Sequence, residues 1–189
     1  MSRTRLAVFL ASHLVAFAAL WTGVSRTAAV LCVAVFAIQI LGVTIGYHRY
    51  FSHRAFETSR PMQLVLAVFA QASLQKGVLW WASHHRYHHR HSDCDDDLHS
   101  PRHGLWWSYV GWIFHDAASV TRLDQVKDLA QVPELRLLDR FEYSPGILLA
   151  LPCLAIGGWA GLVVGFGWGT ILSHHATFAN NCFAHVFGT

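Results

Sequence analysis

Five histidines fall within eight consecutive residues of this chain, and this stretch constrains the fold more than any other: His84, His85, His88, His89 and His91. A packed core has little use for so many ring nitrogens, because each buried donor or acceptor without a partner costs free energy. Neutral imidazole is, however, the commonest protein ligand for divalent transition metals. The stretch therefore predicts a metal site, and the fold must bring further ligands to the same place.

The composition is typical of a membrane protein. Of the 189 residues, 53% are hydrophobic and only 13% are charged, with eight Trp and twelve Phe, which is too apolar for a soluble protein of this size. The formal net charge is only +3, and the basic residues are scattered, so nothing indicates nucleic-acid binding. The four cysteines lie far apart without a Cys-x-x-Cys pair, which indicates no disulfide framework.

Four apolar runs each approach the ~20 residues that a helix needs to cross a bilayer. They pair into two helical hairpins and comprise residues 6–24, 28–47, 145–164 and 166–187. The glycines between 165 and 169 predict the turn of the second hairpin. The N-terminus resembles a signal peptide, but its apolar run is long enough to span and predicts an uncleaved helix. The predicted fold is a single all-α integral membrane domain covering residues 1–189.

Positive charges gather at the ends of the first hairpin rather than at its turn. The turn carries Arg26 alone, whereas the two ends carry Arg3, Arg5, Arg49, Arg54 and Arg60. By the positive-inside rule, both ends of the hairpin are predicted to be cytoplasmic. Residues 48–143, which are largely polar and separate the two hairpins, are therefore expected to form a cytoplasmic helical cap.

Residues 61–81 are moderately apolar and could be counted as a further crossing. Such a crossing would place the later histidines on the opposite side of the bilayer from His48 and His53, and one metal site could not include both groups. The stretch also contains several polar residues, namely Gln63, Gln71, Ser73, Gln75 and Lys76. We therefore predict an interfacial or re-entrant helix, which this mixture of apolar and polar residues permits.

Two groups of candidate metal ligands lie in the predicted cap. His48 and His53 are about 140° apart around an ideal helix, so they can share a site only if the helix ends or loosens between them. His85, His88 and His89 have i, i+3, i+4 spacing, which places their rings on one helical face. The second group is the stronger signal, because its spacing alone brings three imidazoles together.

A third group, Asn181 and His185, has i, i+4 spacing near the predicted cytoplasmic end of the fourth span. Polar side chains inside a membrane helix usually face the protein interior for a functional reason. Taken alone, however, the pair is explained equally well by a hydrogen bond between helices.

The other polar residues near these groups have more ordinary interpretations. His84 and His91 are expected to surround the ligands. The acidic run Asp95–Asp97 is expected to form either a solvated turn or a set of acceptors for the N–H groups of ligand imidazoles, rather than to bind metal. His174 and His175 are expected to form hydrogen bonds or line a cavity. Structural roles are predicted for His13 and His115, whereas spacing leaves undecided the roles of His99 and His103.

Taken in order, residues 46–54, 81–89 and 181–188 resemble successive histidine boxes of the membrane fatty acyl desaturase family, which includes stearoyl-CoA desaturases. The resemblance implies a four-span membrane enzyme with a cytoplasmic cap and two iron ions held almost entirely by histidine. By position it implies that Asn181 contacts a metal through water. The iron ligands that it implies are His48, His53, His85, His88, His89 and His185.

The resemblance also implies the reaction and its partners. The family takes two electrons from a donor such as ferredoxin, or cytochrome b5 with its reductase, uses O₂, and removes hydrogens from adjacent methylene carbons of a long acyl chain. An incomplete coordination sphere leaves room for O₂ at such metals. The expected location is the bacterial inner membrane or the endoplasmic reticulum, with the N-terminus and the histidine boxes cytoplasmic.

One departure from the family pattern stands out. Relatives carry a further His-x-x-His-His box after the fourth span, which this sequence does not contain, so we expect a C-terminally incomplete domain with one iron site incomplete. Three functions remain open. They are an acyl desaturase, a lipid or alkane hydroxylase of the same superfamily, and a metal-binding or transport membrane protein or inactive fragment.

Overall fold

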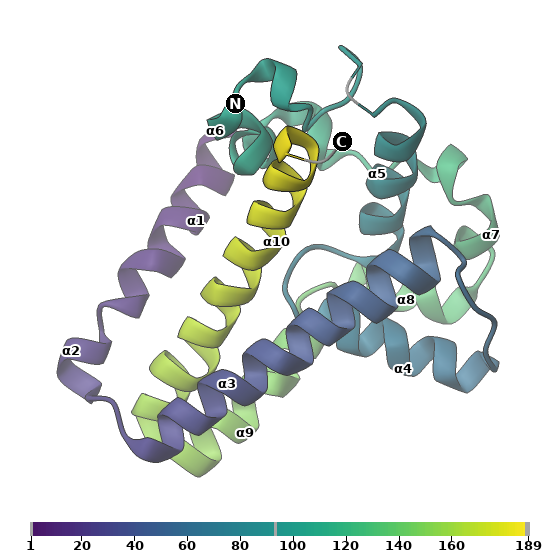
Figure 1. Cartoon of the computed structure of the whole chain (residues 1–189). Coiled ribbons are helices and arrows are strands. Elements are labelled where there is room, and N and C mark those ends of the chain that lie inside the picture. The colour runs from purple at the N-terminus through teal and green to yellow at the C-terminus, as the bar shows by residue number, and fades with distance from the viewer. Residues whose placement is uncertain (1, 93, 188–189) are drawn as a thin grey trace.

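The computed structural model describes residues 2–92 and 94–187, with side chains through residue 184. The described residues form helices and connecting loops without any β-strand (Figure 1). This confirms an all-helical fold. The longer helices are α1 (Arg3–Ala16), α3 (Arg26–Leu41), η1 (Gly42–Ser52), α4 (Arg60–Gln71), α5 (Val78–Arg90), α9 (Ser144–Ala160), η6 (Gly161–Trp168) and α10 (Gly169–Phe187).

Short helices connect these longer ones, and most of them belong to the segment between residues 90 and 144. They are α2 (Ala19–Thr22), η2 (Pro101–His103), α6 (Leu105–Tyr109), η3 (Gly111–Phe114), η4 (Asp116–Ser119), η5 (Leu123–Gln125), α7 (Lys127–Ala130) and α8 (Pro133–Arg140). All of them except α2 make up the cap together with α4 and α5, so the cap consists of many short helices.

Three helical runs are long and apolar enough to cross a membrane: Arg3–Thr22, Arg26–Ser52 and Ser144–Ala184. The last run has 41 residues, about twice the number that a bilayer requires. It is interrupted at Gly158, which has a φ of +59°. Glycine adopts this left-handed conformation without steric cost, so the chain can change direction at that point.

The break in the third run lies earlier than the glycine pattern predicts, because residues 161–169 are helical. Their glycines instead allow close packing against α3. A Cβ atom on Gly165 would lie 2.8 Å from the Cβ of Leu31, and one on Gly169 would lie 2.9 Å from the carbonyl oxygen of Cys32. Small residues at a helix interface are a common device in membrane bundles.

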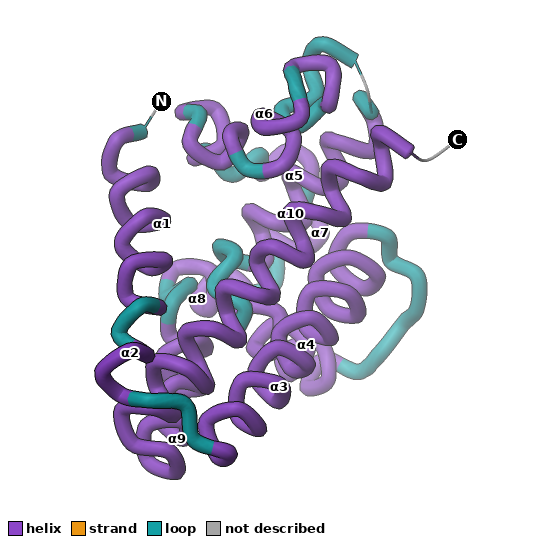
Figure 2. Tube along the Cα trace, turned by 60° about the vertical axis from the view of Figure 1, so that its left-hand side comes forward, coloured by secondary structure: helices purple, strands orange, loops and turns teal. Residues whose placement is uncertain are grey.

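The ends of the long runs meet the cap at one end of the molecule (Figures 1 and 2). The backbone N–H of Ser2 donates to the Phe114 carbonyl, and Arg5 forms an ion pair with Asp116 at 3.2 Å. At the same end, α10 passes beside α6. The opposite end of the bundle holds α2, the start of α3 and the break in α9.

The stretch predicted as one interfacial helix forms α4 and α5, which are joined by residues 72–77. This turn lies between α3 and α10. Gln39 donates to the Ala72 carbonyl at 2.9 Å, and His174 donates to the Ser73 carbonyl at 2.7 Å. The backbone groups of the turn thus find partners on the long helices, as non-helical backbone within a membrane bundle requires.

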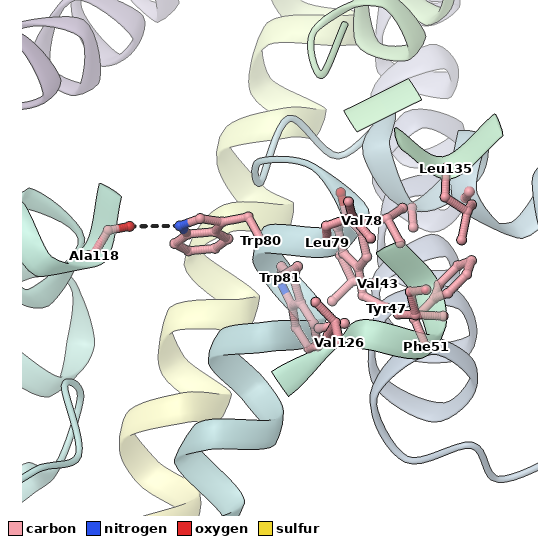
Figure 3. Packing of buried hydrophobic residues seen from close by; sticks show 14 of the residues in the cluster. Val43, Tyr47, Phe51, Val78, Leu79, Trp80, Trp81, Ala118, Val126 and Leu135 are labelled. Atoms are coloured by element: carbon pink, nitrogen blue, oxygen red, sulfur yellow. Dashed lines mark hydrogen bonds between the residues drawn. The ribbon is translucent and has the colours of Figure 1, made fainter. Parts of the chain in front are cut away.

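The main hydrophobic core lies where α5 packs against η1, α4 and the short helices of the cap (Figure 3). Trp80 and Trp81 are each 8% exposed within it, and the indole N–H of Trp80 donates to the Ala118 carbonyl at 2.7 Å. Two adjacent tryptophans bury a large apolar area. This core fixes the helix that carries the histidine-rich stretch.

Candidate metal centre

The first pair of candidate ligands is brought together by a change in helical winding. Over η1 the backbone has π-helical hydrogen bonds, and the N–H of His53 donates to the His48 carbonyl five residues back at 3.0 Å. The two imidazole rings lie 4.4 Å apart between centroids. The helix therefore loosens between these histidines, as their spacing requires, and π-helical turns are frequent at functional sites.

Two glycines allow η1 to lie against α4. A Cβ atom on Gly42 would lie 2.4 Å from the Phe69 carbonyl oxygen, and one on Gly46 would lie 2.9 Å from the Leu66 carbonyl oxygen. A side chain at either position would collide with the backbone of α4. These glycines thus allow η1 and α4 to pack closely just before the first histidine pair in the sequence.

The second group lies on α5, which covers the whole stretch from Val78 to Arg90. This confirms the helix that the i, i+3, i+4 spacing predicted. The first backbone N–H groups of α5 find side-chain acceptors elsewhere in the cap: Val78 donates to Gln71 at 3.1 Å, and Leu79 donates to Asp139 at 2.9 Å. These contacts fix the start of the helix.

The two groups converge on His85. Its Nε2 atom lies 3.1 Å from Nε2 of His53 and 3.0 Å from Nε2 of His89, and its ring centroid is 4.7 Å from that of His48. One candidate ligand atom from each of His48, His53 and His85 falls within 4.8 Å of the others. Ring nitrogens that face one another so closely need a shared proton or metal cation, because neutral imidazole offers one lone pair and one N–H.

The electrostatics favour the form of imidazole that binds metal. Burial, followed by the charges of His89, His48 and His53, lowers the pKa of His85 far below its ordinary value. The ring is therefore neutral and carries a lone pair. Trp81 stacks on it at 4.7 Å between centroids and covers one of its faces.

His88 is held by a buried carboxylate. Its Nδ1 atom lies 2.8 Å from the carboxylate of Asp97, and the exposed fractions of the two residues are 3% and 1%. Burial alone would raise the pKa of Asp97, but the hydrogen bond from His88 and the charge of His99 hold it below its ordinary value. An ionised Asp97 accepts a hydrogen bond from Nδ1 and so fixes the tautomer and orientation of the His88 ring.

Asp97 and His99 extend the site beyond the sequence prediction. With His88 they form a second buried group whose ligand atoms lie close enough to hold a metal ion, and the His99 ring lies 3.9 Å from the His88 ring. The sequence placed Asp97 among general acceptors and left His99 undecided. Both lie in a loop, where spacing carries no information about which side chains meet.

The other predicted residues lie apart from the histidine cluster or outside the described part of the chain. Asn181 is partly buried on α10, and no hydrogen bond or ring contact joins it to the cluster among the described residues. The side chain of His185 lies outside the described part. His84 donates to the Val120 carbonyl at 3.0 Å, and His91 contacts the Tyr87 carbonyl at 2.9 Å, so both are engaged apart from the cluster.

The roles assigned to histidines within the long helices are confirmed as hydrogen bonding. Nε2 of His175 lies 2.9 Å from Nε2 of His13, and the Tyr109 hydroxyl lies 2.8 Å from its Nδ1. His115 caps η4 by accepting from Ala117. The four cysteines are free thiols, as their spacing predicted.

The donor set fits a transition metal. Four imidazoles from two elements converge, and a fifth is oriented by a carboxylate, which is the usual outer support of a metal-binding histidine. Imidazole suits iron, zinc, copper and nickel. The geometry thus supports a transition-metal centre.

Comparisons with known proteins identify the family of the chain. The fatty acid desaturase family model matches residues 25–188. The chain is 34% identical over 149 residues to the sn-1 stearoyl-lipid 9-desaturase of Anabaena variabilis, which covers 78% of this chain and 55% of the relative. It is 32% identical over 186 residues to the palmitoyl-monogalactosyldiacylglycerol delta-7 desaturase, chloroplastic, of Arabidopsis thaliana, which covers 96% and 50%.

A third relative gives a similar match. The chain is 33% identical over 153 residues to the sn-2 palmitoyl-lipid 9-desaturase of Nostoc sp. (strain 36), which covers 78% of this chain and 54% of the relative. The chain spans about half the length of the curated relatives it matches. With the family match extending over most of its length, the chain belongs to the fatty acid desaturase family.

Proposed function

We propose that this protein is an O₂-dependent fatty acyl desaturase with a histidine-bound iron centre. The observation that carries the proposal is the convergence of His53 and His89 on His85, with His48 beside them. One pair of facing imidazoles is explained by a hydrogen bond, as between His13 and His175, but a cluster of four imidazoles around one point favours a bound cation. The substrate would be a long acyl chain carried by a glycerolipid or by coenzyme A.

The residues of the chain would supply a preorganised iron site. When bound, iron supplies the oxidising chemistry needed to remove hydrogen from an unactivated methylene group with O₂. His48, His53, His85 and His89 would hold it as neutral ligands. Asp97 would fix the tautomer and orientation of the His88 ring, and Trp81 would cover one face of the His85 ring.

We also propose two iron ions. The described residues form two groups, one around His85 and one around His88. The first has more imidazoles, and the second would need further ligands, among which His185, with Asn181 acting through water, are the candidates from α10. Iron content per chain, measured on purified protein, gives a direct count.

For the membrane arrangement we propose four crossings, because the break at Gly158 divides the third apolar run in two. All four crossings would then begin or end at the cap. The arginine distribution supports a cap on the cytoplasmic side of the membrane. An electron donor such as ferredoxin, or cytochrome b5 with its reductase, would reach the centre from that side.

The test is expression of the full protein in a host that lacks the corresponding desaturase, followed by analysis of acyl chains. New double bonds are expected, and His85→Ala should reduce their yield by more than about 100-fold because it removes the ligand at the centre of the cluster. His103→Ala is the matched control, because His103 is exposed and lies outside both groups. Hydroxylated chains without double bonds would instead indicate a hydroxylase.

Metal analysis separates the enzyme from a metal-binding membrane protein. The purified wild type is expected to contain iron, and His85→Ala is expected to lose it. Zinc in place of iron, together with no O₂ consumption when electrons are supplied, would contradict the proposal and would indicate binding or transport.

A further inference from the structure

Arg86 follows His85 directly on α5, yet all of its contacts lie outside the histidine cluster. Its Nε donates to the Ser52 carbonyl at 3.3 Å, and Nη2 donates to the Phe51 carbonyl at 2.6 Å. Nη1 donates to the Gln125 carbonyl at 3.0 Å. The two terminal nitrogens also donate to the carboxylate of Asp128, at 2.8 and 3.1 Å.

These contacts use the whole hydrogen-bonding capacity of the side chain. A guanidinium has five N–H donors, and each of the five has an acceptor here. The Arg86 side chain is only 9% exposed. A cavity of about 360 Å³ beside it is lined by Arg54, Glu57 and the Arg86–Asp128 pair, but Arg86 has no donor left for a ligand there.

Two of the carbonyl groups that accept from Arg86 lie next to a candidate metal ligand. Phe51 and Ser52 immediately precede His53, and Arg86 immediately follows His85. The Nε2 atoms of these two histidines are 3.1 Å apart. The guanidinium therefore joins the backbone of the first histidine box to the helix of the second, one residue away from the contact between their rings.

Asp128 keeps the guanidinium in place. Burial alone would raise the pKa of its carboxyl group, but the hydrogen bonds and charge of Arg86, with a contribution from Arg54, hold the pKa below its ordinary value. The carboxylate binds both terminal nitrogens of Arg86, a bidentate geometry that lysine cannot reproduce. The planar fork thus has a fixed orientation.

We infer that Arg86 is a positioning residue, which sets the location of His53 relative to His85 through the carbonyl groups of Phe51 and Ser52. The inference rests on the proposed iron centre. Lysine at this position would keep the positive charge but has three donors on one nitrogen atom. It could not hold Phe51, Ser52, Gln125 and Asp128 at once.

The test measures Fe(II) binding by the purified full protein, by competition with a chromogenic chelator under anaerobic conditions. Arg86→Lys and Arg86→Gln are both expected to bind Fe(II) about 10- to 100-fold more weakly than the wild type, the range seen when outer partners of histidine ligands are removed. At saturating iron, their Mössbauer spectra should differ from that of the wild type, because the ligand positions change. Arg90→Gln is the matched control.

Arg90 lies one turn further along α5, is exposed, and donates to the side-chain oxygen of Gln125. Its variant should bind Fe(II) within twofold of the wild type. Fe(II) binding by Arg86→Lys within twofold of the wild type, with an unchanged spectrum, would overturn the inference. If the wild type itself binds no Fe(II), the proposed function fails instead.

A second variant covers the case in which both Arg86 substitutions prevent folding. Asp128→Asn keeps the backbone contacts of Arg86, but it removes the negative charge, one of the two oxygen acceptors of the fork and the ion pair with Arg54. It is expected to weaken Fe(II) binding by about threefold to 10-fold, less than the loss of Arg86 itself. An Asp128→Asn protein with wild-type Fe(II) affinity and spectrum would count against the positioning role.

Discussion

A single buried carboxylate decides how His88 can take part in metal binding. Asp97 contacts Nδ1 of His88 and is 1% exposed. Asp97→Asn removes the charge that stabilises the Nδ1–H tautomer, so we expect Fe(II) affinity to fall by about 10-fold. Asp95→Asn makes the same change at an 85% exposed side chain in the same loop. Equal Fe(II) affinities for these two variants would show that Asp97 does not orient a ligand.

Asp128 gives a pH-dependent prediction. Its pKa in the folded protein lies below the ordinary value of 3.8, so its contribution to stability is present above 3.8 and is lost as the pH falls through the folded value. At pH 7, Asp128→Asn should lower the free energy of unfolding by about 1 kcal/mol, a modest amount because the side chain is 37% exposed.

Thermal unfolding of both proteins across the acidic range checks this prediction. The difference in unfolding temperature between wild type and Asp128→Asn should shrink as the pH drops below 3.8. A difference that stays constant down to pH 2 would mean that the ionisation of Asp128 is not the source of its effect.

For single residues, the sequence predicts only those arrangements that follow from the spacing of neighbouring positions. His85, His88 and His89 could be assigned to one helical face because their positions on α5 follow from their numbers. Arg86 was not recognised, because its acceptors are backbone carbonyls more than 30 residues away. Contacts of that kind depend on the packing of whole helices, and no local pattern encodes them.

The packing of η1 against α4 depends on Gly42. A methyl group there would lie 2.4 Å from the Phe69 carbonyl oxygen, and rigid backbone cannot move aside cheaply. Gly42→Ala should therefore destabilise the protein by about 1–3 kcal/mol. Gly167→Ala is the matched control, because its nearest neighbour would be 3.6 Å away, and alanine favours a helix by up to about 1 kcal/mol.

Thermal unfolding in one detergent compares the two glycine variants. We expect Gly42→Ala to unfold at a lower temperature than the wild type and Gly167→Ala at the same or a slightly higher temperature. If the two variants unfold together, close packing at η1 does not limit stability.

One of the several polar contacts that attach α1 to the rest of the molecule joins two histidines. None of its residues is buried, and His13 meets His175 on α10 at 2.9 Å. Because the His13 Nδ1 faces the Phe9 carbonyl at 2.7 Å, it carries the proton and leaves Nε2 to accept from His175. His13→Ala should cost about 0.6 kcal/mol, the average for hydrogen bonds between membrane helices.

Hydrogen exchange along α1 measures this loss. His13→Ala should raise exchange throughout the helix, whereas Ser12→Ala, which removes a hydroxyl bonded only within the same region of α1, should leave it unchanged. Unaltered exchange in His13→Ala would show that aromatic contacts such as Phe9 with Phe114 suffice to hold α1.

The apolar runs predicted the type of secondary structure correctly, but they predicted less accurately where each helix begins and ends. The all-helical fold follows from composition. The prediction that residues 61–81 do not cross the bilayer came instead from the need to place the later histidines on the same side as His48 and His53. The turn of the last apolar run could not be placed, because glycines at 158 and at 165 look alike in sequence. Only packing distinguishes them: Gly158 adopts a positive φ in open space, whereas Gly165 faces Leu31.

For the whole molecule, the cysteines provide natural reporters of the proposed membrane arrangement. Cys94 is exposed in the cap, whereas Cys32 and Cys153 are buried within the long helices. A membrane-impermeant maleimide should therefore label Cys94 in inside-out vesicles and leave it unlabelled in right-side-out vesicles. Cys94→Ser should abolish the labelling. An Arg26→Cys substitution in that background, at the opposite end of the bundle, should show the reverse pattern. Labelling of Cys94 from outside sealed cells would place the histidine cluster on the other side of the membrane and would exclude a cytoplasmic electron donor.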